Sequence, residues 1–139
     1  MKLVILLCLV ASTYAIGTTQ SAGVRGKLIC NGRPAAGVTV RLYDSDAGFG
    51  VDDLMAAGIT DKNGKFKISG YETEIMTIDP KLNIYHDCND GIKPCKRMFT
   101  IIIPDSYVSK GKVARKIYDA GVIQLDGKFP GEIQSQSQR

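Results

Sequence analysis

The chain has 139 residues, a formal net charge of +4, four cysteines and a single histidine. This length is that of one ordinary domain built around one hydrophobic core. The small positive charge does not favour a nucleic-acid-binding protein. After the N-terminal segment, no apolar run approaches the roughly 18 residues of a membrane-spanning helix.

The first 15 residues, MKLVILLCLVASTYA, have the pattern of a secretory signal peptide. Lys2 precedes a run of apolar residues, and Thr13 and Ala15 suit the −3 and −1 positions of a signal peptidase site. We therefore predict that residues 1–15 are removed and that the mature chain is secreted and extracellular.

Turn-forming residues recur about every 8–12 residues, a spacing typical of an all-β sandwich or barrel. Between them, hydrophobic alternation predicts about seven strands and no strong helix. The clearest alternation places Val38, Val40 and Leu42 on one face of a strand. Turns are expected at Asn31-Gly32 and Asn63-Gly64. In chain order, the predicted strands cover residues 24–30, 38–43, 54–60, 65–69, 77–87, 96–103 and 116–125.

The last residues, GEIQSQSQR at 131–139, are polar and are predicted to form a flexible tail. Residues 16–130 contain no recognisable repeat or linker. The predicted organisation is therefore a signal peptide (1–15), one β-domain (16–130) and a tail (131–139).

Four segments together resemble the transthyretin-like family of secreted nematode proteins, and they extend over nearly the whole mature chain. The resemblance implies a transthyretin (prealbumin-like) fold, an all-β sandwich of about seven antiparallel strands in two sheets. The alternation pattern alone does not distinguish that topology from an immunoglobulin sandwich. The segments are GVRGKLICNGRPAAGVTVRLYD (23–44), GITDKNGKFKISGYETEI (58–75), DPKLNIYHDCNDGIKPC (79–95) and YDAGVIQLDGKFPGE (118–132).

The wider superfamily includes thyroid-hormone carriers and 5-hydroxyisourate hydrolases, but the residues of neither activity can be matched here. The hydrolase depends on several histidines, an arginine and a C-terminal Tyr-Arg-Gly-Ser, whereas this chain has one histidine and ends in Ser-Gln-Arg. The sequence also lacks a Gly-x-Ser-x-Gly elbow and a phosphate-binding glycine loop. We therefore predict no catalytic residues, no enzymatic activity and no cofactor.

Cleavage of the signal removes Cys8 and leaves Cys30, Cys88 and Cys95 in an oxidising compartment. Cys88 and Cys95 lie at the facing ends of two predicted strands, so we predict a disulfide between them. It either rigidifies the enclosed loop for binding or simply staples a hairpin. For Cys30 we favour a buried free thiol, with an intermolecular disulfide or pairing to Cys88 or Cys95 as alternatives. The candidate binding loop consists of Asn89, Asp90, Gly91, Ile92, Lys93 and Pro94.

His86 shares a strand face with the apolar residues 82 and 84, so we expect a partly buried, hydrogen-bonded ring. The alternative is a zinc set of His86, Cys88, Cys95 and either Asp87 or Asp90. Its spacing is atypical for zinc, and a disulfide competes for the thiols. We therefore predict no metal site.

Charged residues form two further groups. The acidic residues 44, 46, 52 and 53 do not have the spacing of a calcium-binding loop, and we interpret them as a solvated loop. The basic residues form a candidate patch for anionic lipid headgroups or acidic glycans, although charged loops also guard the edges of a β-sandwich. The candidate patch consists of Lys110, Lys112, Arg115 and Lys116.

Together these observations favour a secreted, non-enzymatic binding module whose partner is an extracellular or cell-surface molecule. Two alternatives stay open. One is carriage of a small hydrophobic ligand such as a lipid or hormone, and the other is a bridge between an anionic membrane surface and a receptor. The sequence indicates neither a nucleic-acid partner nor a transmembrane segment.

Overall fold

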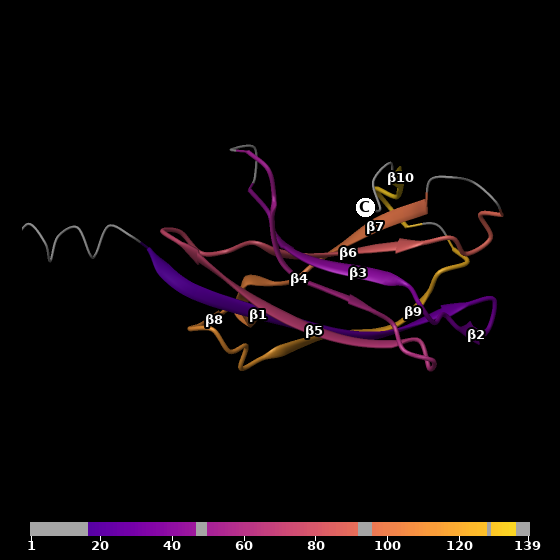
Figure 1. The fold of residues 1–139 in the computed structure, drawn as a ribbon, viewed down its shortest axis with the longest axis horizontal. Coiled ribbons are helices and arrows are strands. Elements are labelled where there is room, and N and C mark those ends of the chain that lie inside the picture. Colours follow the sequence, from indigo (N-terminus) through magenta and orange to yellow (C-terminus); the bar gives the residue numbers. More distant parts are fainter. Residues whose placement is uncertain (1–16, 47–49, 92–95, 128, 136–139) are drawn as a thin grey trace, which may run out of the picture.

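The computed structural model describes residues 17–46, 50–91, 96–127 and 129–135, which form two stacked β-sheets (Figure 1). Seven strands are six residues or longer, which confirms the predicted all-β sandwich. The elements are β1 (Thr18–Cys30), β2 (Arg33–Pro34), β3 (Thr39–Asp44), β4 (Asp53–Ile59), β5 (Lys65–Glu74), β6 (Pro80–His86), β7 (Lys96–Ile102), the 3-10 turn η1 (Asp105–Tyr107), β8 (Ser109–Lys110), β9 (Ile117–Gln124) and β10 (Ile133–Ser135).

The upper layer in Figure 1 is a sheet with the strand order β10–β7–β6–β3–β4, and all its neighbouring strands are antiparallel. In the lower layer β1 is central. It pairs along the same stretch with β5, which is antiparallel, and with β9, which is parallel, so these two strands flank it on opposite edges. The short strands β2 and β8 also pair with β1. We call the layers the β3–β6–β7 sheet and the β1–β5–β9 sheet.

The core lies between the sheets and is built from the inward-facing residues that alternation predicts. Val40 and Leu42 of β3 are fully buried, and Phe66 of β5 is 6% exposed. Lys65 and Lys67, on either side of Phe66, are exposed. Burying such an apolar side chain contributes about 1.5–3 kcal/mol. The cluster also contains Val24, Leu28, Leu82, Ile84, Phe99, Ile103 and Leu125.

The β1–β5–β9 sheet extends further than the sequence predicts. β1 begins at Thr18 rather than at residue 24, and β5 continues to Glu74 rather than ending at residue 69. The two extensions pair with each other, starting from Thr18↔Glu74. Their residues are mostly small or polar and show little apolar alternation, so it is the backbone ladder that keeps them extended.

The predicted C-terminal tail begins as part of the fold. Residues 133–135 form β10, which pairs with β7 through Ile133↔Met98. The preceding residue, Glu132, is bound by Arg97. The domain therefore continues past residue 130, because a buried arginine anchors a segment whose composition is that of a tail. Residues 136–139 lie outside the described part of the chain.

A bulge interrupts β9 where it runs beside the middle of β1. Between the pairs Arg25↔Asp119 and Lys27↔Val122, β1 advances by two residues and β9 by three. Gly121 has a φ of +75°, which favours glycine, and its N–H donates to Asp119 Oδ1 at 2.9 Å. The bulge lies on the wall of a groove on the outer face of this sheet.

Candidate functional site

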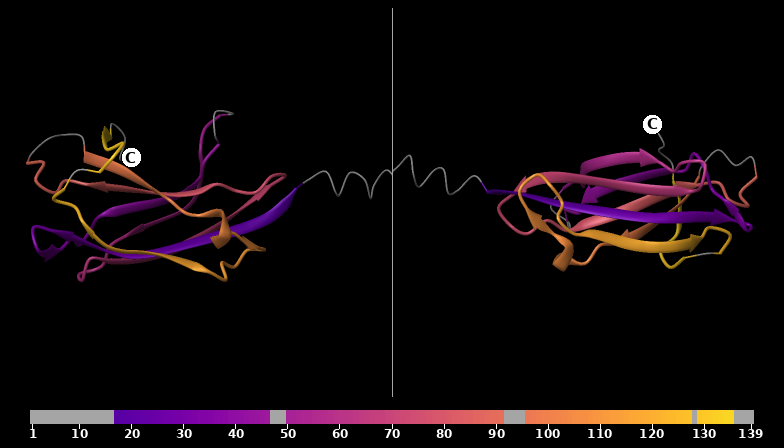
Figure 2. Two further views of the ribbon diagram at one scale, coloured as in Figure 1. Left: turned by 180° about the vertical axis from the view of Figure 1, so that it is seen from behind. Right: turned by 90° about the horizontal axis from the view of Figure 1, so that it is seen from below.

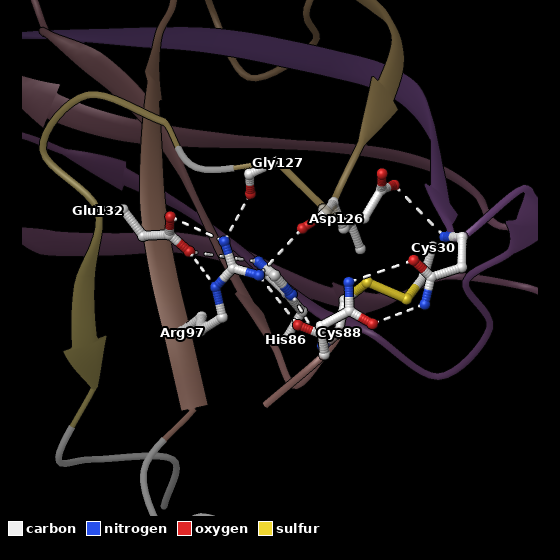
Figure 3. The surroundings of a disulfide bond; sticks show 10 residues. Cys30, His86, Cys88, Arg97, Asp126, Gly127 and Glu132 are labelled. Atoms are coloured by element: carbon white, nitrogen blue, oxygen red, sulfur yellow. Dashed lines mark hydrogen bonds and ion pairs between the residues drawn. A yellow bond between two sulfur atoms is a disulfide. The ribbon is translucent and has the colours of Figure 1, made fainter. Parts of the chain in front are cut away.

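The structure pairs Cys30 with Cys88 rather than Cys88 with Cys95 (Figure 3). The two Cα atoms are 5.9 Å apart, a usual distance for a native disulfide. The bond joins the end of β1 in one sheet to the segment after β6 in the other. The predicted Cys88–Cys95 bond and the predicted free thiol at Cys30 are therefore wrong, and Cys95 itself lies outside the described residues.

The path of the chain after β6 explains this error. The β6–β7 ladder ends at His86↔Arg97, and both Cys88 and Cys95 stand two residues beyond that pair. The main chain turns there, since Asp90 N–H donates to Asp87 O at 3.0 Å and Asn89 has a φ of +57°. Cys88 is consequently part of the core, 5% exposed, where it meets Cys30 of the opposite sheet.

Two asparagines reinforce the disulfide from the solvent side. Asn31 Nδ2 donates to Asn89 Oδ1 at 2.6 Å, and Asn89 Nδ2 donates to Asn31 Oδ1 at 3.2 Å. The backbone N–H of Asn31 also donates to the Asp126 carboxylate at 3.4 Å. The three loops that follow β1, β6 and β9 are thus held together at one end of the sandwich (Figure 3).

The structure describes residues 89–91 of the candidate binding loop, and these contacts involve the first of them. Asn89 is paired with Asn31, Asp90 is buried and Gly91 is exposed. Residues 92–94, Ile-Lys-Pro, lie outside the described residues. A binding role for this loop stays a prediction.

Arg97 is buried next to the disulfide and uses all five N–H groups of its guanidinium (Figure 3). Nε and Nη2 donate to the two oxygens of Glu132 at 2.5 and 2.9 Å. The other three N–H groups donate to the backbone carbonyls of Cys88, Leu125 and Gly127 at 2.9, 3.2 and 2.6 Å. Arg97 therefore connects β7 to the Cys88 loop and to the C-terminal segment. No sequence signal identified it, because its partners are dispersed along the chain.

His86 lies beside Arg97 in the same cluster and is 2% exposed. Its Nδ1 accepts the Cys88 N–H at 3.1 Å, so the neutral ring carries its proton on Nε2, 3.8 Å from Glu132 Oε1. Burial, and then the charge of Arg97, lower the pKa of His86. The charge of the Glu132 carboxylate opposes this lowering of the pKa. It does not reverse the lowering, because Arg97 neutralises the carboxylate. The expectation of a hydrogen-bonded histidine is confirmed, and the ring is more completely buried than predicted.

We expect His86 to make the protein less stable in acid. In the unfolded chain the ring takes up a proton near its ordinary pKa of 6.5, whereas the folded ring does so only at lower pH. The stability contributed by the neutral ring is fully present above the unfolded pKa of 6.5 and is lost as the pH falls through the folded pKa. His86→Gln should therefore weaken the loss of stability in urea unfolding between about pH 7 and 5. If the variant and the natural protein lose the same free energy of unfolding over this pH range, the expectation is contradicted.

A group of carboxylates gathers at the opposite end of the sandwich. Oxygens of Asp44, Asp53 and Glu74 all lie within 4.8 Å of one another. Asp44 is 3% exposed and accepts the Asp79 N–H at 2.9 Å, so the interpretation of this residue as part of a solvated loop is wrong. Glu74 is contributed by β5 of the opposite sheet, which the sequence did not indicate.

A shared proton accounts for this close approach. The hydrogen bond with Asp44, and then burial, raise the pKa of Glu74 to about 7. Carboxylate oxygens are also ligands for Ca²⁺, and within the described ranges these are the three residues that could hold a cation together. The hydrogen bond between Glu74 and Asp44 accounts for their close approach without a cation, and we assign no metal here.

We expect Glu74 to make the protein less stable in mild alkali. Its folded pKa of about 7 lies above the ordinary value of 4.5. The stability contributed by the protonated Glu74 is therefore fully present below its ordinary pKa and is lost as the pH rises through about 7. Glu74→Gln keeps a hydrogen-bond donor and should be more stable than the natural protein at about pH 8, by about 1 kcal/mol after allowance for solvent screening. Urea unfolding in EDTA checks this, and equal stability at alkaline pH would contradict it.

A groove of about 560 Å³ lies on the outer face of the β1–β5–β9 sheet, the layer that Figure 2 (right) shows from below. Cations of β1 and β5 face each other across it as register partners, Arg25↔Lys67 and Lys27↔Lys65. A Cβ on Gly26 would lie 2.8 Å from the Phe66 ring, so only glycine fits there. The groove is lined by Arg25, Gly26, Lys27, Asp61, Lys65, Phe66, Lys67, Asp119, Gly121 and Val122.

The structure divides the basic patch predicted from the sequence. Lys112 Nζ lies 5.4 Å from the centroid of the Tyr71 ring, on the same face of β5 as the groove. Lys116 Nζ instead donates to Ser106 O at 3.4 Å. Lys110 belongs to β8, and the Arg115 N–H donates to Ser109 Oγ at 3.0 Å. The groove cations were missed because they belong to strands far apart in the sequence.

A second, apolar cleft of about 420 Å³ is lined by the part of β7 that extends beyond its pairing with β10 and by β9 of the other sheet. At its C-terminal wall the rings of Phe99 and Phe129 stack with centroids 4.4 Å apart. The opposite side of the sandwich is closed by contact between β4 and β5. The cleft is lined by Phe99, Thr100, Ile101, Ala120, Ile123, Phe129 and Pro130.

The two stacked sheets form a β-sandwich of the transthyretin-like class. The family model described as TTR-52, the transthyretin-like family, matches residues 25–104. The chain belongs to this family.

Relatives from Caenorhabditis elegans support the same assignment. Transthyretin-like protein 5 is 74% identical over 133 residues, which cover 95% of this chain and 96% of that protein. Transthyretin-like protein 2 is 51% identical and covers 91% of this chain and 88% of its own length. Transthyretin-like protein 33 is 48% identical, with 91% and 87% covered.

Among solved structures, a 9R-lipoxygenase from Cyanothece matches 76% of this chain and 16% of its own. At 24% identity and a TM-score of 0.44, this likeness carries no argument. Within the described residues, no helix is long and apolar enough to cross a membrane.

Proposed function

We propose that the protein is a secreted, non-enzymatic binding module that recognises an anionic extracellular or cell-surface partner through the groove of the β1–β5–β9 sheet. The observation that carries the proposal is the facing pairs Arg25↔Lys67 and Lys27↔Lys65. Like charges directly opposite each other destabilise a sheet. The arrangement therefore lowers the stability of the free protein, and bound anions would offset that loss.

Secretion is supported by the signal pattern at residues 1–15 and by the disulfide between Cys30 and Cys88, since disulfides persist in oxidising compartments. Expression of the full chain in a eukaryotic cell should give a product in the medium that begins at Ile16. Retention of an uncleaved chain inside the cell would contradict secretion.

Binding of the labelled mature protein to intact cell surfaces tests the groove directly. The groove variant is Lys27→Gln with Lys67→Gln, which removes one cation from each facing pair. The matched control is Lys110→Gln with Lys116→Gln, which removes the same charge elsewhere on the surface. We expect salt-sensitive binding that weakens about tenfold in the groove variant and changes little in the control. Equal binding by the groove variant and the natural protein would assign the partner to another surface.

The apolar cleft supports carriage of a small hydrophobic ligand as a second candidate function. Its lining from β7, β9 and Phe129 offers apolar contact over about 420 Å³, a size typical of ligand sites. Ala120→Phe should fill the cleft, whereas Val122→Phe changes the groove face of the same strand. Binding of a fluorescent fatty acid should be lost in the first variant and kept in the second. Absence of binding by the natural protein would exclude this function.

A further inference from the structure

We infer that the groove binds a sulfated polysaccharide of the cell surface or extracellular matrix. The inference rests on the proposed function and names the chemical class of its ligand. Three features of the groove carry it: the excess of cations over carboxylates, the repeated spacing of the cations along the sheet, and the carboxylate and apolar groups beside them.

The cations outnumber their counter-charges. Asp119 Oδ2 lies 3.4 Å from Arg25 Nη2. Asp61 is engaged locally, because its Oδ1 accepts the backbone N–H groups of Asn63 and Lys65 at 2.9 and 3.0 Å. In the part of the chain that the structure describes, the side chains of Lys27 and Lys67 make no ion pair with these or other carboxylates. The groove therefore presents positive charge that an external anion can neutralise.

The spacing of these cations suits a linear polyanion better than a single phosphate. Facing residues on neighbouring strands have Cβ atoms about 4.5–5.5 Å apart, and residues on one face of a strand repeat about every 6.7 Å. Arg25, Lys27 and their partners thus form a four-point array. Lys112 adds a further cation beside Tyr71, whose register partner in β1 is Ser21. Ser21 and Lys27 are six positions apart along β1, which is roughly 20 Å.

The groups between the cations match the chemistry of a sugar. Asp61 and Asp119 can accept hydrogen bonds from hydroxyl groups, which a sulfated sugar carries and an inorganic polyphosphate does not. Val122 is 63% exposed and offers an apolar surface for the C–H face of a sugar ring. Sulfate groups would contact the four cations, and the hydroxyl groups would contact the two carboxylates at the rim.

A lipid surface fits the groove less well. Attachment to a membrane combines cations with apolar side chains that insert beside them. The neighbouring residues Ile75 and Met76 are 79% and 77% exposed, but they follow β5 and therefore lie at the opposite end from Lys27 and Lys65. The groove itself is recessed between side chains, which suits an extended chain rather than a plane.

The test compares three immobilised probes: heparin, chemically desulfated heparin, and vesicles of equimolar phosphatidylserine and phosphatidylcholine. We expect the mature protein to bind heparin with strong salt dependence and to bind desulfated heparin at least tenfold more weakly. The groove variant (Lys27→Gln with Lys67→Gln) should lose about tenfold in heparin affinity, equivalent to about 1.4 kcal/mol. The control variant (Lys110→Gln with Lys116→Gln) should stay within about twofold of the natural protein.

The outcomes separate the ligand class from the proposed function. Binding to the vesicles through the groove, with no binding to heparin, overturns the polysaccharide and leaves the anion-binding module intact. Binding to none of the three probes, together with groove-independent attachment to cells, overturns both. Equal weakening by the groove and control variants shows attraction by net charge alone and also overturns the inference.

Thermal unfolding supplies a check that does not depend on the ligand. Because Lys27 faces Lys65 and Lys67 faces Arg25, removing one cation from each pair relieves repulsion. The groove variant should unfold at the same or a slightly higher temperature than the natural protein. A weakened affinity in a variant with unimpaired stability is then a property of the groove, whereas a marked loss of stability would refute the repulsive pairing.

Discussion

Replacing Arg97 with methionine should lower the free energy of unfolding by about 3–5 kcal/mol, the range for removing one partner of a buried ion pair. The substitution leaves the Glu132 carboxylate, 10% exposed, without its counter-charge. It also removes the donors to the carbonyls of Cys88, Leu125 and Gly127. An unsatisfied buried polar group costs about 1–3 kcal/mol. The C-terminal segment with β10 should detach first, because Arg97 is its side-chain anchor.

Urea unfolding and hydrogen exchange of the C-terminal segment measure this effect. Arg33→Met is a matched control, since Arg33 is exposed on β2 and its replacement should change stability by less than about 0.5 kcal/mol. Combining Arg97→Met with Glu132→Leu should recover part of the loss, because the unpaired carboxylate is removed as well. A loss below about 1 kcal/mol for Arg97→Met would contradict the role of the guanidinium.

Removing the disulfide between Cys30 and Cys88 should have an effect of similar size. The two cysteines are 58 residues apart, and for a loop of this length the chain-entropy model gives a stabilisation of roughly 4 kcal/mol. Cys30→Ala and Cys88→Ala should each lose this stabilisation. They should lose nearly the same amount, because each variant breaks the same bond.

Cys95→Ala separates this pairing from the one that the sequence suggested. If Cys30 is the partner of Cys88, the change at residue 95 leaves the disulfide in place and the unfolding midpoint nearly unchanged. Peptide mapping of the oxidised protein should give a fragment that joins the two segments around residues 30 and 88. A stable Cys30→Ala variant beside an unstable Cys95→Ala variant would show the opposite pairing.

Local patterns predicted the strands because strand formation here follows from burial. In β3, the alternation of Val40 and Leu42 with polar residues already indicates which face is in the core. In β5 the same alternation buries Phe66 and leaves Lys65 and Lys67 exposed. Where alternation is weak, as in the N-terminal part of β1, the strand was missed. Its extended backbone depends on a ladder with residues about 50 positions away.

The candidate sites required the assembled fold. Cys88 has two possible partners in the sequence, and a turn after His86 selects the one in the other sheet. Glu74 lies next to Asp44 because two sheets stack, not because the residues are close in sequence. The same holds for the groove, where Lys27 and Lys65 become neighbours by strand register. None of these contacts has a local signature.

The sequence by itself therefore determined the class of fold, the inward face of the main strands and membership of the transthyretin-like family. These depend on local alternation and on motifs that lie within single segments. The tertiary structure alone decided the disulfide partner, the anchoring of the C-terminal segment by Arg97 and the pairing of cations across the groove. Each of these depends on register and stacking between distant segments, which composition and local spacing do not specify.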